Sequence, residues 1–232
     1  MNAPRSAAAG TGRAARVWLF DLDDTLHDAT QAAYAGINEG MTRYIEQHLE
    51  LNRDDANALR RRYWLRYGAT LLGLVRHHGV DAAHFLHHAH LLLGLEERVR
   101  GQRHDIAALA RLRGRRVLLT NAPAVYTARV LGVLGIAHLF ERIVSIEDMH
   151  MFGQLRPKPD ARMLRALAVR LAVHPSRCVL VEDTLVHQKA ARRIGMGTVW
   201  MQRWLRQGHP TARLQRRPAY VDRRVRRLRD LR

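Results

Sequence analysis

The stretch Val17-Trp-Leu-Phe-Asp-Leu-Asp-Asp-Thr25 decides how the rest of the chain is interpreted. Its first four residues form an uninterrupted apolar run, which is typical of a strand buried in a parallel sheet. Three carboxylates follow within four residues, at Asp21, Asp23 and Asp24. Carboxylates at the carboxyl end of a buried strand are suited to holding a hard divalent cation beside a phosphate. The alternative is an acidic turn without a chemical role, and these nine residues alone leave both interpretations open.

The composition is that of a globular protein. The chain has 232 residues, 47% of them hydrophobic, which suits one medium domain or a domain with an inserted subdomain. No apolar run reaches the ~20 residues that a bilayer span needs, and the amino terminus lacks the apolar segment of a secretory signal. We therefore expect a cytoplasmic protein with no membrane partner. The single cysteine, Cys178, lies in an apolar run, which predicts a buried side chain and excludes an internal disulfide.

The formal net charge is +18, and almost all of the basic residues are arginines. A charge of this size attracts polyanions, so a basic nucleic-acid-binding protein is one alternative. The arginines are spread along the whole chain instead of gathering in one patch with aromatic residues between them. We therefore expect no specific nucleic-acid partner, only the weak polyanion binding that any protein this basic would show.

Changes of pattern divide the chain into parts. Residues 1–15 are rich in Ala, Gly and Ser and predict a disordered lead-in. Residues 28–101 show only helical periodicity, with Asp81 as a candidate N-cap, and predict an inserted helical subdomain. Residues 16–27 and 102–232 alternate short apolar strands with helices of ~10 to 15 residues, which is typical of βαβ units. The predicted fold is α/β, a doubly wound parallel sheet whose later strands are 117–121, 143–146, 179–181 and 198–201.

The arginine-rich end, residues 206–232, has two interpretations. It could be a basic tail for nucleic acid, because it holds ten arginines. However, residues 219–221 could form a short edge strand, and Val225, Leu228 and Leu231 then follow at a helical spacing. We favour a final strand and helix that pack on the sheet, because the apolar period is present.

Polar side chains end several of the predicted strands, at the edge where an open α/β sheet binds its ligands. Lys158 lies between two prolines, which restrict the backbone and could present its ammonium group rigidly. Phosphate-ester hydrolysis through a covalent intermediate needs a carboxylate nucleophile, an acid/base, a metal, and donors around the phosphoryl group. The strand-end residues that could supply these parts are Asp21, Asp23, Thr120, Asn121, Glu182 and Asp183.

Four segments resemble the motifs of the haloacid dehalogenase superfamily of aspartate-nucleophile phosphohydrolases, and the resemblance runs from about residue 16 to the carboxyl terminus. The segments are Phe20-Asp-Leu-Asp-Asp-Thr25, Leu119-Thr-Asn121, Lys158-Pro-Asp160 and Val181-Glu-Asp-Thr184. The helical insert is similar to the cap that one subgroup carries between its first two motifs. The wording of the second and fourth motifs resembles the pyrimidine 5′-nucleotidase-like branch, which implies substrates such as UMP and CMP. A sugar phosphate or phosphoglycolate is the alternative substrate.

The resemblance implies a role for each motif residue. Asp21 would be the nucleophile that becomes an aspartyl phosphate, and Asp23 the general acid and then the general base. An acid at position 23 favours phosphate-ester hydrolysis, because the dehalogenase branch lacks it. Asp24 has no catalytic role and is expected to hydrogen-bond the turn. The phosphate ligands would be Thr120, Asn121 and Lys158, and the Mg²⁺ ligands Asp21, Asp183 and the backbone carbonyl of Asp23.

Two further groups of residues are expected to support the site or to lie outside it. Glu182 is a possible supporting residue, as is His187, which stands where relatives usually have Asn or Asp near the metal. Six histidines between residues 77 and 90 could include zinc ligands, for example His84 with His87 or His88. Only Asp81 could complete such a set locally, so packing or surface histidines are the favoured interpretation.

Overall fold

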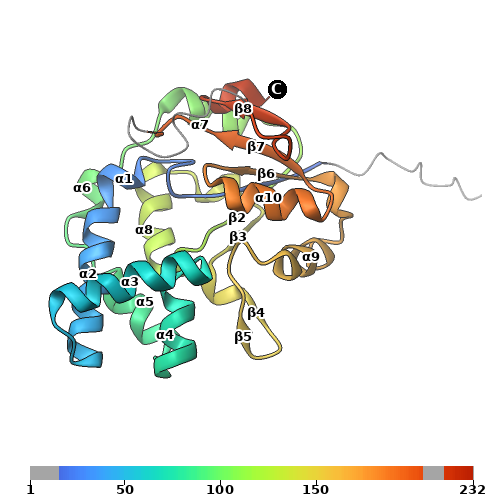
Figure 1. Ribbon diagram of the computed structural model, residues 1–232. Coiled ribbons are helices and arrows are strands. Elements are labelled where there is room, and N and C mark those ends of the chain that lie inside the picture. The colour runs from blue at the N-terminus through green and yellow to red at the C-terminus, as the bar shows by residue number, and fades with distance from the viewer. Residues whose placement is uncertain (1–15, 206–216, 232) are drawn as a thin grey trace, which may run out of the picture.

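A six-stranded sheet forms the centre of the computed structural model, which describes residues 16–205 and 217–231. The strand order is β3-β2-β1-β6-β7-β8, and every neighbouring pair is parallel (Figure 1). The predicted lead-in, residues 1–15, lies outside the described residues. The predicted α/β fold is confirmed, with strands β1 (Val17–Phe20), β2 (Arg115–Leu119), β3 (Arg142–Val144), β6 (Cys178–Glu182), β7 (Gly197–Met201) and β8 (Arg223–Val225).

Helices cover both faces of this sheet. Successive side chains of a strand point to opposite faces, so each strand contributes to two apolar layers. The layer that contains Phe20 packs against α7 and α8, and the layer that contains Leu19 packs against α9 and α10. Burial on both faces explains why β1 has no polar residue. The bounds of these helices are α7 (Arg103–Ala110), α8 (Ala124–Leu134), α9 (Ala161–Arg170) and α10 (Leu185–Arg193).

Residues 28–101, which lie between β1 and α7, contain helices and no strand of the sheet. Helices α2 to α5 bury an apolar cluster of their own, which also includes Ile146 from beyond β3. The Asp28 backbone N–H donates to the Arg100 carbonyl at 3.3 Å, so the segment begins and ends at one place beside the sheet. Its helices are α1 (Ala29–Ala32), α2 (Tyr34–Leu49), α3 (Arg53–Tyr67), α4 (Thr70–His78), α5 (Ala82–Ala89) and α6 (Leu95–Arg98).

Side-chain caps determine where several helices begin. Asp28 accepts a hydrogen bond from the Gln31 backbone N–H at the start of α1. Asp81 accepts one from the His84 backbone N–H at 2.6 Å, which confirms the predicted N-cap of α5. Each cap satisfies a backbone donor that the first helical turn leaves unpaired. Among residues 16–205 and 217–231, no helix combines the length and apolar character that a bilayer-crossing segment needs.

The predicted elements after residue 205 are wrong in position, although their packing is as expected. The last strand is β8, not 219–221, and the last helix is a short 3-10 helix, η5 (Leu228–Leu231). Residues 218–221 instead form a turn in which the Val221 N–H donates to the Pro218 carbonyl at 3.0 Å. The strand β8 then pairs with β7, and Leu228 is buried against the sheet. Part of the arginine-rich end, residues 206–216, lies outside the described residues.

The segment after β3 also differs from its prediction. The strand expected at 143–146 ends at Val144, because Ser145 caps a short 3-10 helix, η2 (Ile146–Asp148). A two-stranded hairpin of β4 (His150–Met151) and β5 (Gln154–Leu155) follows and was not predicted. Its two-residue turn is Phe152-Gly153, with φ 51° and 73°. Gly153 is usual in such a turn, but Phe152 stands where Asn, Asp or Gly is usual, which weakens the turn signal. The other 3-10 helices of the described residues are η1 (Ala137–Leu139) and η3 (Pro175–Arg177).

Candidate active site

The carboxyl ends of β1, β2 and β6 bring polar residues together at one edge of the sheet. Asp21 continues β1, since its backbone N–H donates to the Val181 carbonyl at 3.0 Å. Thr120 follows β2 and is fully buried. Its hydroxyl oxygen accepts a hydrogen bond from the Ala122 backbone N–H at 3.0 Å, which leaves the hydroxyl hydrogen available to another acceptor. Glu182 ends β6, so the carboxylates and the hydroxyl meet where the sequence predicts ligands.

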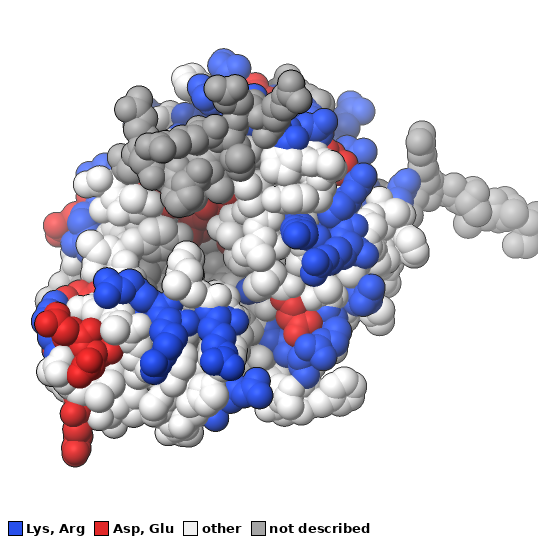
Figure 2. Space-filling model, viewed as in Figure 1, with Lys and Arg blue, Asp and Glu red and all other residues white. Residues whose placement is uncertain are grey.

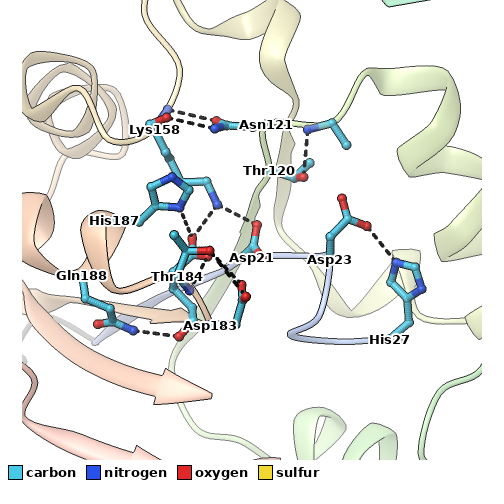
Figure 3. Close-up of polar contacts among 12 residues, drawn as sticks. Asp21, Asp23, His27, Thr120, Asn121, Lys158, Asp183, Thr184, His187 and Gln188 are labelled. Carbon is cyan, nitrogen blue, oxygen red and sulfur yellow. Dashed lines mark hydrogen bonds and ion pairs between the residues drawn. The ribbon is translucent and has the colours of Figure 1, made fainter. Parts of the chain in front are cut away.

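Lys158 is the buried cation of this site. Its side chain is 1% exposed, and Nζ lies 2.6 Å from Asp21 Oδ1 and 2.7 Å from Glu182 Oε2. The Asn121 side chain fixes the lysine backbone, because Oδ1 accepts from the Lys158 N–H and Nδ2 donates to the Lys158 carbonyl, both at 2.9 Å (Figure 3). Both polar atoms of Asn121 are thus engaged by the backbone. The structure gives Asn121 this positioning contact, and its expected contact with phosphate stays a prediction, since Nδ2 carries a second hydrogen.

Three carboxylates, Asp21, Glu182 and Asp183, offer oxygen atoms that all lie within 4.8 Å of one another. Burial raises the pKa of Asp21 to about 8, with the Glu182 charge acting in the same direction and Lys158 opposing both. Burial also raises the pKa of Asp183 well above its usual range, and the charges of Glu182 and Asp21 add to this shift. One lysine does not balance three clustered carboxylates, and a hard divalent cation with oxygen ligands would. The residues present therefore fit Mg²⁺.

Glu182 differs from its two neighbours because cationic groups hold it. Burial alone would raise its pKa, but Lys158 and His187 lower the pKa below the usual value. His187 Nδ1 lies 3.0 Å from Glu182 Oε2, and the Thr184 backbone N–H donates to the other oxygen at 3.2 Å. The structure thus places both predicted supporting residues at the site, with His187 beside Glu182.

Asp23 has contacts separate from those of the carboxylate cluster. Its Oδ1 accepts a hydrogen bond from the Tyr126 hydroxyl at 2.8 Å and lies 2.9 Å from His27 Nε2. Figure 3 shows Asp23 and His27 on one side of Asp21, with Lys158 and His187 on the other. One oxygen of the Asp23 carboxylate is engaged there, and the resemblance implies that Asp23 would contact a metal through its backbone carbonyl.

Asp24 is used to hold the turn. Its Oδ1 accepts from the Thr30 backbone N–H at 2.9 Å, and its Oδ2 accepts from the Thr30 hydroxyl at 2.5 Å. Its backbone has φ 54°, a left-handed conformation that Asp and Asn tolerate better than most residues. The expectation that Asp24 hydrogen-bonds the turn is confirmed.

The helical segment contributes aromatic residues to the site. Tyr34, the first residue of α2, is 36% exposed. Desolvation of its hydroxyl and the nearby Asp23 and Asp183 charges raise its pKa above the usual value. The ring of His90 packs edge-on against Tyr126, with 5.6 Å between the ring centres. Figure 2 shows acidic atoms recessed in a hollow of this face. Sequence reasoning did not identify Tyr34, His27 or Tyr126, because no local motif includes them, whereas His90 belongs to the histidine-rich stretch noted in the sequence.

The histidine-rich segment mostly packs within the helices. The Tyr63 hydroxyl lies 2.8 Å from His78 Nε2, and the Tyr44 hydroxyl lies 2.9 Å from His84 Nδ1. Within the described residues, the one group of ligand atoms close enough together to hold a metal ion is the acidic cluster. These contacts agree with the favoured interpretation of packing or surface histidines.

Comparison with known proteins identifies the family. A sequence profile described as haloacid dehalogenase-like hydrolase matches residues 15–195, well over half of the chain. The chain belongs to this family. The hydrolase is also 22% identical over 198 residues to Phosphate metabolism protein 8 of Saccharomyces cerevisiae (strain ATCC 204508 / S288c), covering 80% of this chain. The matched part spans 61% of the yeast protein, less than two thirds of its length.

Solved structures share the fold of the hydrolase at low sequence identity. A HAD phosphatase from Thermococcus onnurineus is similar with a TM-score of 0.60 and 20% identity, covering 93% of this chain and 95% of that one. L-2-haloacid dehalogenase from Xanthobacter autotrophicus is similar with a TM-score of 0.54 and 18% identity, covering 94% and 96%. Phosphatases and dehalogenases thus share this architecture, so the reaction has to be argued from the site itself.

Proposed function

We propose that this hydrolase cleaves phosphate monoesters through an aspartyl phosphate formed on Asp21. The observation that carries the proposal is the held carboxylate of Asp23, two residues beyond the proposed nucleophile. An alkoxide leaving group needs a proton, whereas a halide leaving group needs none. A carboxyl group fixed beside Asp21 therefore supports ester hydrolysis over carbon–halogen cleavage.

The proposed reaction has two steps. In the first, a carboxylate oxygen of Asp21 attacks phosphorus, the bond from phosphorus to the ester oxygen breaks, and Asp23 gives its proton to that oxygen. In the second, Asp23 takes a proton from water as the water oxygen attacks phosphorus, which releases inorganic phosphate and restores Asp21. Lys158 and the Thr120 hydroxyl donate hydrogen bonds to the phosphoryl oxygens. Thr120 suits this role because its hydroxyl hydrogen is unused among the described residues.

Asp21, Asp183 and the Asp23 backbone carbonyl are the proposed Mg²⁺ ligands. When bound, Mg²⁺ supplies positive charge for the phosphoryl oxygens and offsets the repulsion within the acidic cluster. The support for this assignment is geometric first, because Asp21, Glu182 and Asp183 offer oxygen atoms within 4.8 Å of one another. Burial and, after it, the neighbouring carboxylates raise the pKa of both Asp21 and Asp183, and a bound cation would offset both effects.

The proposed substrate is a pyrimidine nucleoside 5′-monophosphate, with the helical segment of residues 28–101 acting as the cap that selects it. The sequences of Leu119–Pro123 and Val181–Thr184 support a nucleotide substrate, because they resemble the motifs of the pyrimidine 5′-nucleotidase-like branch. The net charge of +18 favours an anionic ligand, and Figure 2 shows basic side chains beside the hollow. The name of the yeast relative refers to phosphate metabolism, which fits a phosphate ester as substrate.

Phosphate release from UMP, CMP, AMP, a sugar phosphate and phosphoglycolate tests the proposal, in Mg²⁺ and in EDTA. We expect the pyrimidine nucleotides to be the best substrates and EDTA to stop turnover. Asp21→Asn should lower the rate at least about 1,000-fold. Asp24→Asn is the matched control, because it removes one charge from the same turn and keeps a residue that tolerates the left-handed backbone.

The outcomes separate the parts of the proposal. A clear preference for sugar phosphates or phosphoglycolate would exclude the nucleotidase assignment and leave the phosphatase chemistry standing. Full activity of Asp21→Asn would exclude the aspartyl phosphate. Undiminished turnover in EDTA would exclude the requirement for Mg²⁺.

A further inference from the structure

Only one of the two carboxylate oxygens of Asp23 has hydrogen-bond partners among the described residues. The Tyr126 hydroxyl and His27 Nε2 both reach Oδ1, at 2.8 and 2.9 Å. Among the described residues, no donor reaches Oδ2. His27 is 0% exposed and Tyr126 is 1% exposed, so both donors are shielded from water, whereas the Asp23 side chain is 16% exposed.

The surroundings of His27 determine which of its nitrogens carries the proton. His27 Nδ1 is buried and has no hydrogen-bond partner. A buried N–H without an acceptor is rarer and less favourable than a buried lone pair without a donor. The proton therefore belongs on Nε2, where it donates to Asp23 Oδ1. Burial and the Asp23 charge raise the pKa of Tyr126, so the phenol also remains a donor.

We propose that His27 and Tyr126 are positioning residues, which hold Asp23 by Oδ1 so that Oδ2 carries the proton to and from the reacting oxygen. This inference rests on the phosphatase function proposed above. A carboxylate on a flexible turn would rotate and present either oxygen in many directions. Two donors on one oxygen remove that freedom, and proton transfer depends steeply on such placement.

The two donors come from parts of the chain that the fold fixes independently. His27 directly precedes Asp28, the N-cap of α1, at the point where the helical segment begins. Tyr126 lies in the first turn of α8, in the apolar layer that contains Phe20. His90, at the end of α5, packs its ring on Tyr126, and its Nδ1 is tied to the Leu86 carbonyl at 2.9 Å. The core therefore contacts the Asp23 carboxylate directly through His27 and Tyr126, and the proposed cap contacts it indirectly, through the packing of His90 on Tyr126.

The experiment compares two esters that differ in their need for a proton. The 4-nitrophenolate of 4-nitrophenyl phosphate leaves without protonation, whereas the ribose alkoxide of UMP requires it. The measured quantity is kcat/KM with Mg²⁺, because it reports the steps through departure of the leaving group. The variants of the full-length protein are Tyr126→Phe, His27→Leu and His27→Gln. Tyr63→Phe is the control, since it removes a Tyr–His hydrogen bond of the same kind (2.8 Å to His78) away from the carboxylates.

We expect Tyr126→Phe and His27→Leu to lower kcat/KM for UMP about 10- to 100-fold, and for 4-nitrophenyl phosphate less than about threefold. His27→Gln should recover most of the UMP activity, because its amide can still donate to Oδ1. Tyr63→Phe should match the wild type on both esters.

Equal losses on the two esters would overturn the proposal, because they would indicate a structural role only. Unchanged activity on both would overturn it as well. If His27→Leu does not fold, Tyr126→Phe decides the matter, because it keeps the ring and removes one oxygen. Failure of the proposed function looks different: the wild type would hydrolyse neither ester, or Asp21→Asn would be as active as the wild type.

Discussion

Replacing Asp21 by Asn should make the metal-free protein more stable at pH 7. Asp21 is buried, and its pKa is raised from 3.8 to about 8 by burial and by Glu182. Keeping this group folded at pH 7 therefore has a free-energy penalty that corresponds to the span from 3.8 to 7, or about 4 kcal/mol at about 1.4 kcal/mol per pH unit. Asn removes the penalty but weakens the hydrogen bond from Lys158 Nζ to Asp21 Oδ1, so we expect a gain of about 2–4 kcal/mol.

The sign of the pH dependence follows from the direction of the shift. A carboxyl group whose pKa is higher in the folded state contributes its full stability below about pH 4, where it is protonated in both states. That stability is lost as the pH rises from about 4 to about 8. The advantage of Asp21→Asn should therefore be small near pH 4 and largest between pH 7 and 8.

Thermal unfolding in EDTA at several pH values is the assay. A gain of 2–4 kcal/mol corresponds to a rise in Tm of about 4–16 °C for a chain of this size. Added Mg²⁺ should stabilise the wild type more than the variant and narrow the difference. Asp54→Asn, on an exposed part of α3, controls for the loss of a negative charge. A variant that is less stable than the wild type at pH 7 in EDTA, or a gain that is the same at pH 4.5 and pH 7, would refute the reasoning.

Three further predictions concern other parts of the same face and the core. Lys158→Met should lower the free energy of unfolding by about 3–5 kcal/mol in urea titrations, because it leaves buried carboxylates without their cation. Asp24→Ala should lower it by about 1–2 kcal/mol through loss of both hydrogen bonds from Thr30, while Asp24→Asn should keep most of that stability. Cys178 should resist iodoacetamide at pH 8 in the native state and react in urea, because burial raises the pKa of the thiol to about 11; rapid native labelling would contradict this.

The parts of the site that the sequence predicted are those fixed by local pattern. The apolar run Val17–Phe20 indicates by itself that β1 is buried, because a strand covered on both faces has no polar residue. The flanking prolines marked Lys158 as a fixed cation before its partners were known. For such residues the chain within a few positions specifies the environment, so the motif and the structure agree.

The residues that were missed depend on contacts between distant segments. Tyr126 lies 103 residues from Asp23, and a buried tyrosine in an amphipathic helix is usually a packing residue. Asn121 was assigned to phosphate because it ends a strand, and its two hydrogen bonds to the Lys158 backbone, 37 residues away, could not be predicted from the local pattern. Local patterns place a side chain at the correct edge of the sheet, and tertiary contacts decide what it bonds.

The three carboxylates after β1 illustrate how neighbours divide one acidic run into separate tasks. Asp21 is buried and contacts Lys158 Nζ, which fixes the position of its carboxyl group. Burial nevertheless leaves the pKa of Asp21 raised. Asp23 has two donors on one oxygen and none of the described donors on the other, which suits a group that must gain and lose a proton. Both carboxylate oxygens of Asp24 accept hydrogen bonds from Thr30, and these bonds fix the turn that follows Asp21 and Asp23. Exchanging the environments of Asp21 and Asp23 would place the Lys158 cation on the proposed acid and take it away from the proposed nucleophile, so the order of these two residues follows from the proposed reaction.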